Sequence, residues 1–331
     1  MNVDWSEVVV SLGPAQPVAA PEPNVPIFPW FPDGHIAMLP LDKQHVMYWA
    51  SSSSYRAVGP GVAGMKLDPP TPVLEAGPAG SFDNGGAWLY SVFCITERQW
   101  LGFYHAEDHA WPGFENPDKI AWKSVALCGS NDAGRTWQKL GPILTSADAK
   151  PAQPTWGGVG DFCVVRDAAR NRWVCVYSDR KLCLAVSDDP HAAPGTWCKY
   201  FGGEFKEPGL GGRQTPLPDL RSRPGANPSV HFNTSLNQWF MIWHTWTGNL
   251  VYALSNDLIH WTQPVTLLKT PLGQKAWYPT VVGESDVLAG EDAQLFYALW
   301  PNTRDWRRQF VQRTIHFGRK PANAASQPSG L

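Results

Sequence analysis

The octapeptide SNDAGRTW (130–137) indicates the fold class of this chain. Ser130 and Asp132 carry side-chain oxygens that can accept hydrogen bonds from the backbone N–H groups of a tight turn. Gly134 can adopt a positive φ without steric cost, and Trp137 can fill the space between two packed sheets. These offsets predict a hairpin turn closed by a tryptophan, and we assign the octapeptide no chemistry.

Two later segments repeat this turn. Residues 187–197 read SDDPHAAPGTW and residues 255–261 read SNDLIHW, so each begins Ser-x-Asp and ends in tryptophan. The terminal tryptophans Trp137, Trp197 and Trp261 are 60 and 64 residues apart. A constant spacing of this size indicates an internal structural repeat.

Short apolar runs precede each turn, for example RWVCVYSD (172–179), LCLAVSDD (182–189) and LVYALSND (250–257). They are rich in β-branched and aromatic residues, have the length of strands and are separated by polar turns. Repeated four-stranded meanders that bury both faces predict an all-β, five-bladed β-propeller of antiparallel blades over residues 27–317. We expect residues 1–26 to form a connector whose EVVVSL stretch (7–12) adds a ring-closing strand to the last blade. Residues 318–331 are expected to form a flexible tail.

Composition excludes several functional classes. The 331 residues carry a net charge of −2 without basic clusters, so no nucleic-acid partner is expected. No apolar run is long enough to span a bilayer, so no membrane partner is expected either. The N-terminus lacks a basic region followed by an apolar stretch, which predicts a cytoplasmic protein, or a secreted or periplasmic one if a signal peptide has been removed.

The six cysteines form no Cys-x-x-Cys pair, which argues against structural zinc. We interpret them as buried thiols on strands, with a disulfide within residues 163–198 left open.

The central funnel of a propeller is lined by the start of each innermost strand, and three polar residues fall at one repeat position there. Asp33, Asp161 and Asn227 each stand twelve residues before the second strand of their blade. A carboxylate at the mouth of an apolar strand is costly unless it is solvated or used, so we predict that Asp33 and Asp161 are catalytic. The alternative is that they cap turns. In the second blade Trp88 holds this position, and Asp83 is the nearest acid that a longer loop can deliver to the funnel.

A long polar segment, residues 202–226, interrupts the meander between the third and fourth blades. Long glycine-rich loops in compact domains often bind ligands. We therefore expect Glu204 or Glu207 to supply a general acid and Arg213 to bind hydroxyls or a carboxylate. The alternative is a solvated surface loop.

Aromatic and histidine side chains near the predicted strand mouths are candidate sugar contacts. Most of the 18 tryptophans must belong to the core. No set of histidines has a spacing that demands a metal, so no metal or other cofactor is predicted, and a structural calcium ion is left open. The candidate substrate-binding residues are Trp30, His35, Trp88, Trp156, Arg213, Asn227, His244 and Tyr278.

The turn SNDLIHW, the repeated meander and an acid opening each of blades one to three resemble the five-bladed glycosidases of glycoside hydrolase family 43 and its relatives. The octapeptide 130–137 resembles the Asp-box of sialidases and other propellers. The first resemblance implies hydrolysis of arabinose, xylose or fructose linkages by an Asp base or nucleophile on blade one, a second Asp that tunes its partner's pKa, and a Glu acid. Asp33 matches the base, and Asp83 and Asp161 fall in the next two blades, where blade three offers Asp161 in place of the glutamate.

The function predicted from these observations is glycoside hydrolysis by carboxylate acid/base catalysis in the funnel, with an oligosaccharide or polysaccharide as substrate. One alternative is a non-catalytic carbohydrate-binding propeller, in which the tryptophans bind and the acids cap turns. A second is a sialidase-like enzyme, but the stretch VPIFPWFP (25–32) lacks the N-terminal arginine of sialidases.

Overall fold

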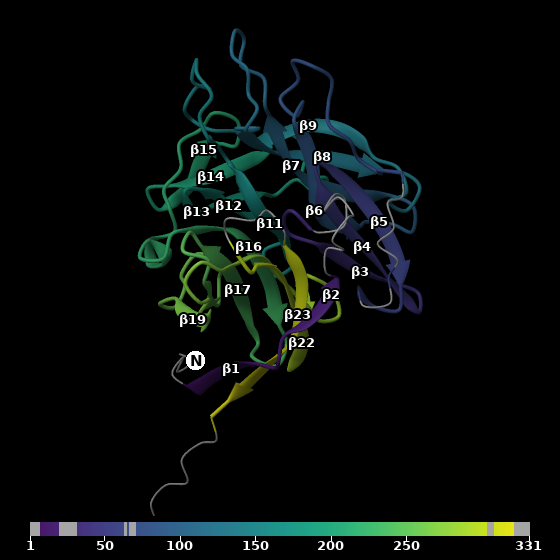
Figure 1. Ribbon diagram of the computed structural model, residues 1–331, viewed down its shortest axis with the longest axis vertical. Helices are drawn as coiled ribbons and strands as arrows, with labels where there is room; N and C mark the ends of the chain where they lie inside the picture. The colour runs from purple at the N-terminus through teal and green to yellow at the C-terminus, as the bar shows by residue number, and fades with distance from the viewer. Residues whose placement is uncertain (1–6, 20–31, 63–64, 66–70, 303–307, 321–331) are drawn as a thin grey trace, which may run out of the picture.

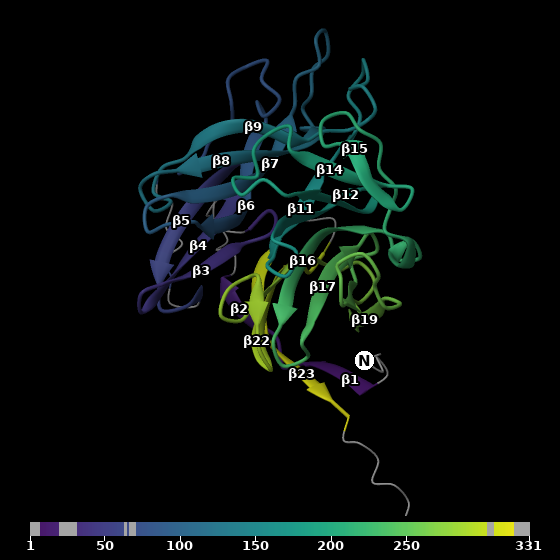
Figure 2. The ribbon, with the colours of Figure 1, turned by 180° about the vertical axis from the view of Figure 1, so that it is seen from behind.

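The computed structural model describes residues 7–19, 32–62, 65, 71–302 and 308–320. Five separate sheets, each of three to five strands, surround a common centre in Figure 1 and in the reverse view of Figure 2. The predicted all-β, five-bladed propeller is therefore confirmed. No helix in the described part of the chain is long and apolar enough to cross a membrane.

The first three blades follow one another along the chain, each starting with its innermost strand. Blade I contains β3 (Ala37–Leu41), β4 (Gln44–Ser51) and β5 (Ser53–Gly59). Blade II contains β6 (Gly86–Cys94), β7 (Trp100–Asp108), β8 (Trp122–Ser130) and β9 (Gln138–Leu144), and β10 (Gly157–Gly158) pairs parallel to β8. Blade III contains β11 (Gly160–Asp167), β12 (Arg172–Asp179), β13 (Lys181–Ser187), β14 (Trp197–Phe201) and β15 (Glu204–Pro208).

Blades IV and V complete the ring. Blade IV contains β16 (Gly225–Asn233), β17 (Gln238–Thr245), β18 (Leu250–Ser255) and β19 (Val265–Leu268), and β21 (Leu288–Ala289) pairs parallel to β16. The 3-10 helix η3 (Pro218–Leu220) lies between blades III and IV in the chain. Blade V contains β20 (Lys275–Val282), β22 (Asp292–Trp300) and β23 (Gln309–Arg319), and it also receives β1 (Val8–Leu12) and β2 (Gln16–Ala19).

Strands from both ends of the chain close the propeller. β1 pairs antiparallel with β23, from Val8 opposite Arg319 to Leu12 opposite Ile315. A strand therefore forms where EVVVSL (7–12) was expected to supply one, and it pairs with the last strand of blade V. β23 continues to Arg319, so the start of the segment predicted as a flexible tail is strand, and residues 321–331 lie outside the described part.

The turn at residues 130–137 makes the hydrogen bonds predicted from its sequence. Gly134 has φ of 73° and donates its N–H to Ser130 Oγ at 2.9 Å. Asp132 Oδ1 accepts the N–H groups of the two residues that follow the glycine, at 3.0 and 2.9 Å. The ring of Trp137 meets Tyr48 of blade I edge-on, with centroids 5.8 Å apart. This turn therefore fastens blade II to blade I.

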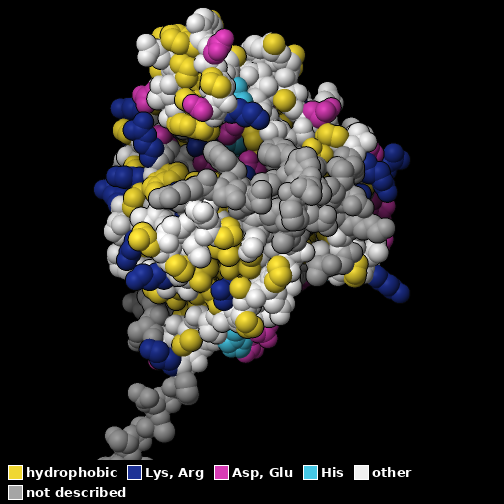
Figure 3. Space-filling view, in the orientation of Figure 1, with side chains coloured by type: hydrophobic (Ala, Val, Ile, Leu, Met, Phe, Trp, Pro, Cys, Tyr) yellow, Lys and Arg dark blue, Asp and Glu magenta, His cyan; other side chains and the backbone are white. Residues whose placement is uncertain are grey.

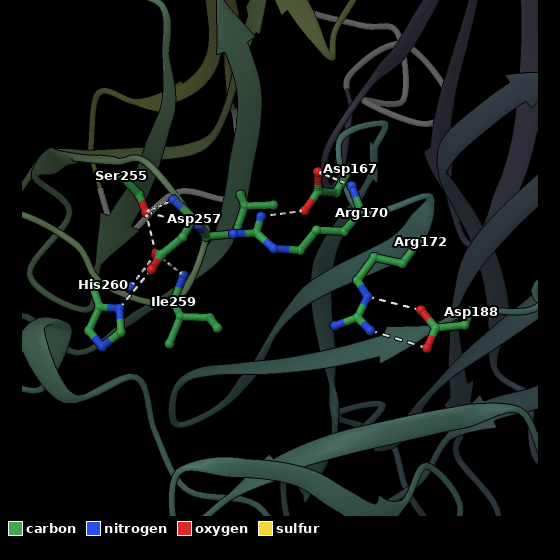
Figure 4. Close-up of polar contacts among 9 residues, drawn as sticks. Asp167, Arg170, Arg172, Asp188, Ser255, Asp257, Ile259 and His260 are labelled. Atoms are coloured by element: carbon green, nitrogen blue, oxygen red, sulfur yellow. Dashed lines mark hydrogen bonds and ion pairs between the residues drawn. The ribbon is translucent and has the colours of Figure 1, made fainter. Parts of the chain in front are cut away.

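The turn at residues 255–261 reaches the same geometry without glycine. Leu258 takes the left-handed conformation, with φ of 68°. Asp257 Oδ1 accepts the N–H groups of Ile259 and His260 at 2.9 and 2.8 Å, as the left half of Figure 4 shows. Ser255 and Asp257 thus hold the turn through the same oxygens as Ser130 and Asp132.

Hydrogen bonds between innermost strands hold the blades in register. Val164 donates its N–H to Ser91 Oγ at 3.0 Å, and Val281 donates to Ser229 Oγ at 3.2 Å. Ile36 donates in the same way to Thr280 Oγ1, also at 3.2 Å. Because these bonds join the innermost strands of neighbouring blades, or the residue just before one, they fix the positions of those strands relative to one another.

All six cysteines are free thiols, and four of them are buried. The disulfide left open within residues 163–198 is therefore absent, and the interpretation as buried thiols holds for Cys128, Cys163, Cys175 and Cys183.

Candidate functional site

Three successive blades place a strained polar residue at the same position of their innermost strand. Asp161, Asn227 and Tyr278 have φ of 49°, 51° and 57°, in the left-handed region. Each stands where an extra residue interrupts the pairing with the second strand. Left-handed backbone costs a non-glycine residue roughly 1 kcal/mol or more, and such strain gathers at functional sites. Bulges of this kind re-aim side chains.

Asp33 holds the equivalent position in blade I. Ile36, three residues later, makes the inter-blade hydrogen bond that Val164 and Val281 make three residues after Asp161 and Tyr278. Because the same inter-blade hydrogen bond follows both residues at the same spacing, Asp33 and Asp161 occupy equivalent positions in their blades.

In blade II the sequence alignment is one residue out. Ser91 corresponds to Ser229 and Thr280, so the residue two positions earlier, Leu89, holds the repeat position in place of Trp88. The bulge in β6 lies between Leu89 and Ser91 and contains Tyr90. Counting twelve residues back from the second strand therefore gives Trp88 and misses the true repeat position by one residue.

The Asp161 carboxylate is enclosed by a lysine and an amide. Lys123 Nζ, from β8, lies 2.7 Å from Oδ2, and the neighbouring blade's Asn227 Nδ2 donates to Oδ1 at 3.2 Å. The side chains of Asp161 and Lys123 are only 15% and 17% exposed. Burial alone would raise the pKa of the Asp161 carboxyl, but the charge and hydrogen bond of Lys123, together with the nearby histidines, outweigh it and hold that pKa well below its usual value.

The Asp33 carboxylate is held by two groups from blade V. Arg308 Nη1 lies 2.5 Å from Asp33 Oδ1, and the arginine side chain is 9% exposed. The second group is Tyr278, whose hydroxyl is hydrogen-bonded to the Asp33 carboxylate. Burial, and then the charge of Asp33, raise the pKa of Tyr278 well above its usual value, so this phenol stays protonated. The Asp33 side chain is 25% exposed, which leaves it open to water or substrate.

Tyr90 contacts the backbone of Asp33. It is buried and donates its hydroxyl to the Asp33 carbonyl at 3.3 Å. Burial and then the charges of Asp161 and Asp33, among other groups, raise its pKa well above the usual value. Gly34 makes the approach possible, because a Cβ there would lie 2.2 Å from the Tyr90 hydroxyl.

An aromatic wall continues from the site to the rim. His244 stacks on Trp277, with centroids 4.9 Å apart, and meets Tyr278 and Trp246 edge-on. Burial lowers the pKa of His244 to about 3, so the ring is neutral. Trp246 is 43% exposed. In Figure 3, acidic, basic and histidine side chains gather in the upper middle of the face.

A third carboxylate, Glu107, lies next to the pair and was missed from the sequence. The Asp161 N–H donates to His105 Nδ1 at 3.0 Å, so the proton of a neutral His105 is on Nε2, which lies 3.1 Å from Glu107 Oε1. His109 Nε2 lies 2.7 Å from Glu107 Oε2. Burial would raise the pKa of Glu107, but the hydrogen bonds from both histidines lower it to about 2. The sequence His-Ala-Glu-Asp-His (105–109) could have predicted this cluster, because alternate residues of an extended chain share a face, which brings His105, Glu107 and His109 together.

Asp83 does not join this site. Its buried carboxylate accepts the Tyr104 hydroxyl at 3.2 Å and pairs with Lys139 of β9, the outermost antiparallel strand of blade II. It thus ties the entry of blade II to the blade's outer edge.

The segment 202–226 was expected to be one long loop, but it contains the strand β15 and the 3-10 helix η3. Glu204 and Glu207 lie on β15, the outermost strand of blade III, where they pair with Lys206 and Arg213. The sequence EFKEP alternates exposed and half-buried positions, as an edge strand does. We therefore leave Glu204, Glu207 and Arg213 out of the candidate site.

The remaining predicted contacts divide between core and rim. His35 is buried and fastens blade I to blade V, with Nε2 3.5 Å from Asp286 and Nδ1 3.4 Å from Thr280. Trp88 is buried edge-on against His105. Trp156 is 55% exposed just before β10, and Trp30 lies outside the described residues.

Among the described residues, no three or more His, Cys, Asp or Glu side chains are placed to hold a metal ion together. The chemistry that the site offers is therefore read from its carboxylates, cations, histidines and aromatic rings.

Comparison with protein-family models gives no match, and comparison with curated protein sequences gives none either. Solved structures do match. An exo-1,5-α-L-arabinanase from a bovine ruminal metagenomic library aligns over 88% of this chain and 96% of its own, at 10% identity and a TM-score of 0.56. The catalytic domain of the Coprinopsis cinerea GH62 α-L-arabinofuranosidase aligns over 94% and 98%, at 12% identity and a TM-score of 0.53.

A third similar structure performs other chemistry. An N-acetylgalactosamine deacetylase from F. plautii aligns over 92% of this chain and 95% of its own, at 13% identity and a TM-score of 0.52. At these identities the likeness shows the fold, and fold alone does not assign a reaction. The chain shares the five-bladed propeller architecture of these carbohydrate-active proteins.

Proposed function

We propose that this chain is a glycoside hydrolase whose reaction takes place between Asp33 and Asp161. The observation that carries the proposal is that two carboxylates occupy the same repeat position in blades I and III and each pair with a largely buried cation. Two carboxyl groups on either side of a sugar are what glycoside hydrolysis requires.

The two acids take different roles. Asp33 is the more exposed carboxylate, with 25% of its side chain exposed against 15% for Asp161, so it is the acid that a water molecule or the anomeric carbon can reach. We assign it the role of base or nucleophile. Asp161 is enclosed by Lys123 and Asn227, so it acts as a fixed negative charge that stabilises the positive charge developing on the sugar.

The substrate class follows from the walls of the site. His244, Trp277 and Tyr278 form an aromatic surface beside Asp33, and aromatic faces bind the apolar faces of sugars. The arabinanase and arabinofuranosidase folds favour arabinofuranosyl linkages, and xylosyl and fructosyl linkages are the next candidates.

The experiment is sugar release from arabinans, xylans, fructans and aryl glycosides, followed by chromatography and by reducing-end assay. We expect release from at least one of them, and no release by an Asp33→Asn variant that remains folded. Tight binding of one polysaccharide without release would instead show a carbohydrate-binding propeller, and release of acetate alone would show an esterase or deacetylase.

A further inference from the structure

The proposed pair of acids lacks an evident proton donor. Asp161 is held as a carboxylate by Lys123, and Asp33 is paired with the Arg308 guanidinium. Asn227, at the same repeat position in blade IV, carries an amide that cannot give up a proton. The leaving oxygen of an unactivated glycoside needs a proton as its bond to the anomeric carbon breaks, so a further group must supply it.

The Glu107 cluster is built to hold one histidine in a defined state. The Asp161 N–H fixes the tautomer of His105, whose other nitrogen then donates to Glu107 Oε1. Glu107 is left with Oε2, which accepts His109 Nε2 at 2.7 Å. A carboxylate on one nitrogen of a histidine orients the ring and stabilises its protonated form.

His109 is placed at the mouth of the innermost strand of blade II. Its ring lies against Gly85, one residue before β6, where a Cβ would come within 2.3 Å of the imidazole. Its backbone N–H donates to the Asn84 side chain at 3.0 Å, which anchors it there. The side chain is 18% exposed, and Nδ1 has no hydrogen-bond partner among the described residues. One nitrogen is thus held by Glu107 and the other is free for a ligand.

We propose that His109, oriented by Glu107, is the proton donor to the leaving group of the glycosidase reaction, an assignment that rests on the proposed function. The anomeric C–O bond breaks with its electron pair passing to the leaving oxygen, and that oxygen takes the proton from His109 Nδ1. When Asp33 acts as base, it takes a proton from the water that adds to the anomeric carbon. Proton exchange with solvent then restores both groups, so the net reaction is hydrolysis.

Two acids lie beside His109. Glu107 is its direct partner, and burial in the cluster keeps this carboxylate away from bulk screening. Asp108, the other acid beside it, is balanced by Lys150 at 2.6 Å and by the Asn84 amide. The neighbourhood therefore carries one net negative charge beside the imidazole.

The test is a leaving-group series on the wild type, His109→Gln and Glu107→Gln, using phenyl, 4-nitrophenyl and 2,4-dinitrophenyl glycosides of the sugar that the enzyme hydrolyses. Dinitrophenolate leaves without a proton, whereas phenolate needs one. We expect His109→Gln to lose at least 100-fold in kcat/KM on the phenyl glycoside and less than 5-fold on the dinitrophenyl glycoside. The fall in activity at high pH should also disappear from its pH profile.

His260→Gln is the matched control, because His260 also pairs with a carboxylate, Asp257 at 2.7 Å, on an exposed turn of blade IV. We expect it to keep wild-type kinetics on all three substrates. Glu107→Gln should show the same leaving-group dependence as His109→Gln in weaker form, because the histidine remains but loses its partner.

Two outcomes overturn the assignment in distinguishable ways. An equal loss by His109→Gln on all three substrates, or no loss, would refute the proton-donor role while leaving a glycosidase in place. A wild type that hydrolyses no glycoside would refute the proposed function, and the assignment would fall with it.

Discussion

Replacing Lys123 by methionine tests the electrostatics of the candidate site. The change removes the cation 2.7 Å from Asp161 and keeps most of the apolar volume of the side chain. Both side chains are more than four-fifths buried, and removing one partner of a buried pair typically costs about 3–5 kcal/mol, because the other charge is left uncompensated. Asp161 keeps the Asn227 amide, so we expect a loss of about 3 kcal/mol in the free energy of unfolding at pH 7.

The pH dependence of this loss has a defined sign. In the wild type the pKa of Asp161 lies below its value in the unfolded chain, so its stabilising contribution is present above about pH 4 and is lost as the pH falls. Without Lys123, we expect burial to raise the pKa of Asp161 above its value in the unfolded chain. The variant should then lose stability as the pH rises above about 4. The difference between wild type and variant should therefore be larger at pH 7 than at pH 4.5.

Urea unfolding followed by tryptophan fluorescence measures these free energies at both pH values. A Lys123→Met/Asp161→Asn double variant should recover most of the loss, which isolates the pair from the other neighbours of Lys123. Lys206→Met is the control, since its pair with Glu204 is exposed to solvent and should contribute no measurable stability. A loss below about 1 kcal/mol at pH 7, or one independent of pH, would refute the description of Asp161 as a buried, paired carboxylate.

Three further changes test the fold. Gly134→Ala should cost about 2–4 kcal/mol, because φ is 73° and the new Cβ would lie 1.9 Å from the Tyr48 hydroxyl. The control Gly195→Ala, with φ of 85° and open space around the residue, should cost only about 1 kcal/mol. Equal costs of the two changes in thermal unfolding would contradict the packing of the turn at residues 130–137. Burial lowers the pKa of Lys199 to about 8, below its value in the unfolded chain, so the wild type should gain stability as the pH rises from about 8 to 10. Urea titrations should show that Lys199→Met lacks this gain. The same rise of unfolding free energy with pH in both proteins would contradict the burial of the ammonium group. Deleting residues 1–13 removes β1 from β23 and should lower the melting temperature by several degrees, whereas an unchanged value would show that β1 does not close the ring.

Local chemistry explains why the fold could be predicted from the sequence. The turn at residues 130–137 is held by side-chain oxygens and a glycine within the same eight residues, so a short window of sequence is enough to predict its conformation. The strand meander follows from runs of apolar residues between such turns, and the ring-closing strand was expected from EVVVSL alone. Where the local pattern was ambiguous, as in EFKEP, an exposed edge strand was interpreted as a binding loop.

The site could be predicted only in part, because its charges are balanced by residues far away in the chain. Repeat position identified Asp33, Asp161 and Asn227, and His244 and Tyr278 were expected near the strand mouths as candidate sugar contacts. The cations were missed, since Lys123 is 38 residues from Asp161 and Arg308 is 275 residues from Asp33. Such pairings are made by the closed ring and have no signature in a short window of sequence.

The most direct test of the central claim is kcat/KM of Asp33→Asn and Asp161→Asn on the polysaccharide that the wild type cleaves best. Asp188→Asn is the matched control, because Asp188 pairs with Arg172 at the surface of blade III, as the right half of Figure 4 shows. We predict losses of at least 1,000-fold for Asp33→Asn and at least 100-fold for Asp161→Asn, by the usual scale of catalytic carboxylates, with wild-type activity for Asp188→Asn. Folded Asp33→Asn and Asp161→Asn variants that cleave at the wild-type rate would show that the reaction takes place elsewhere.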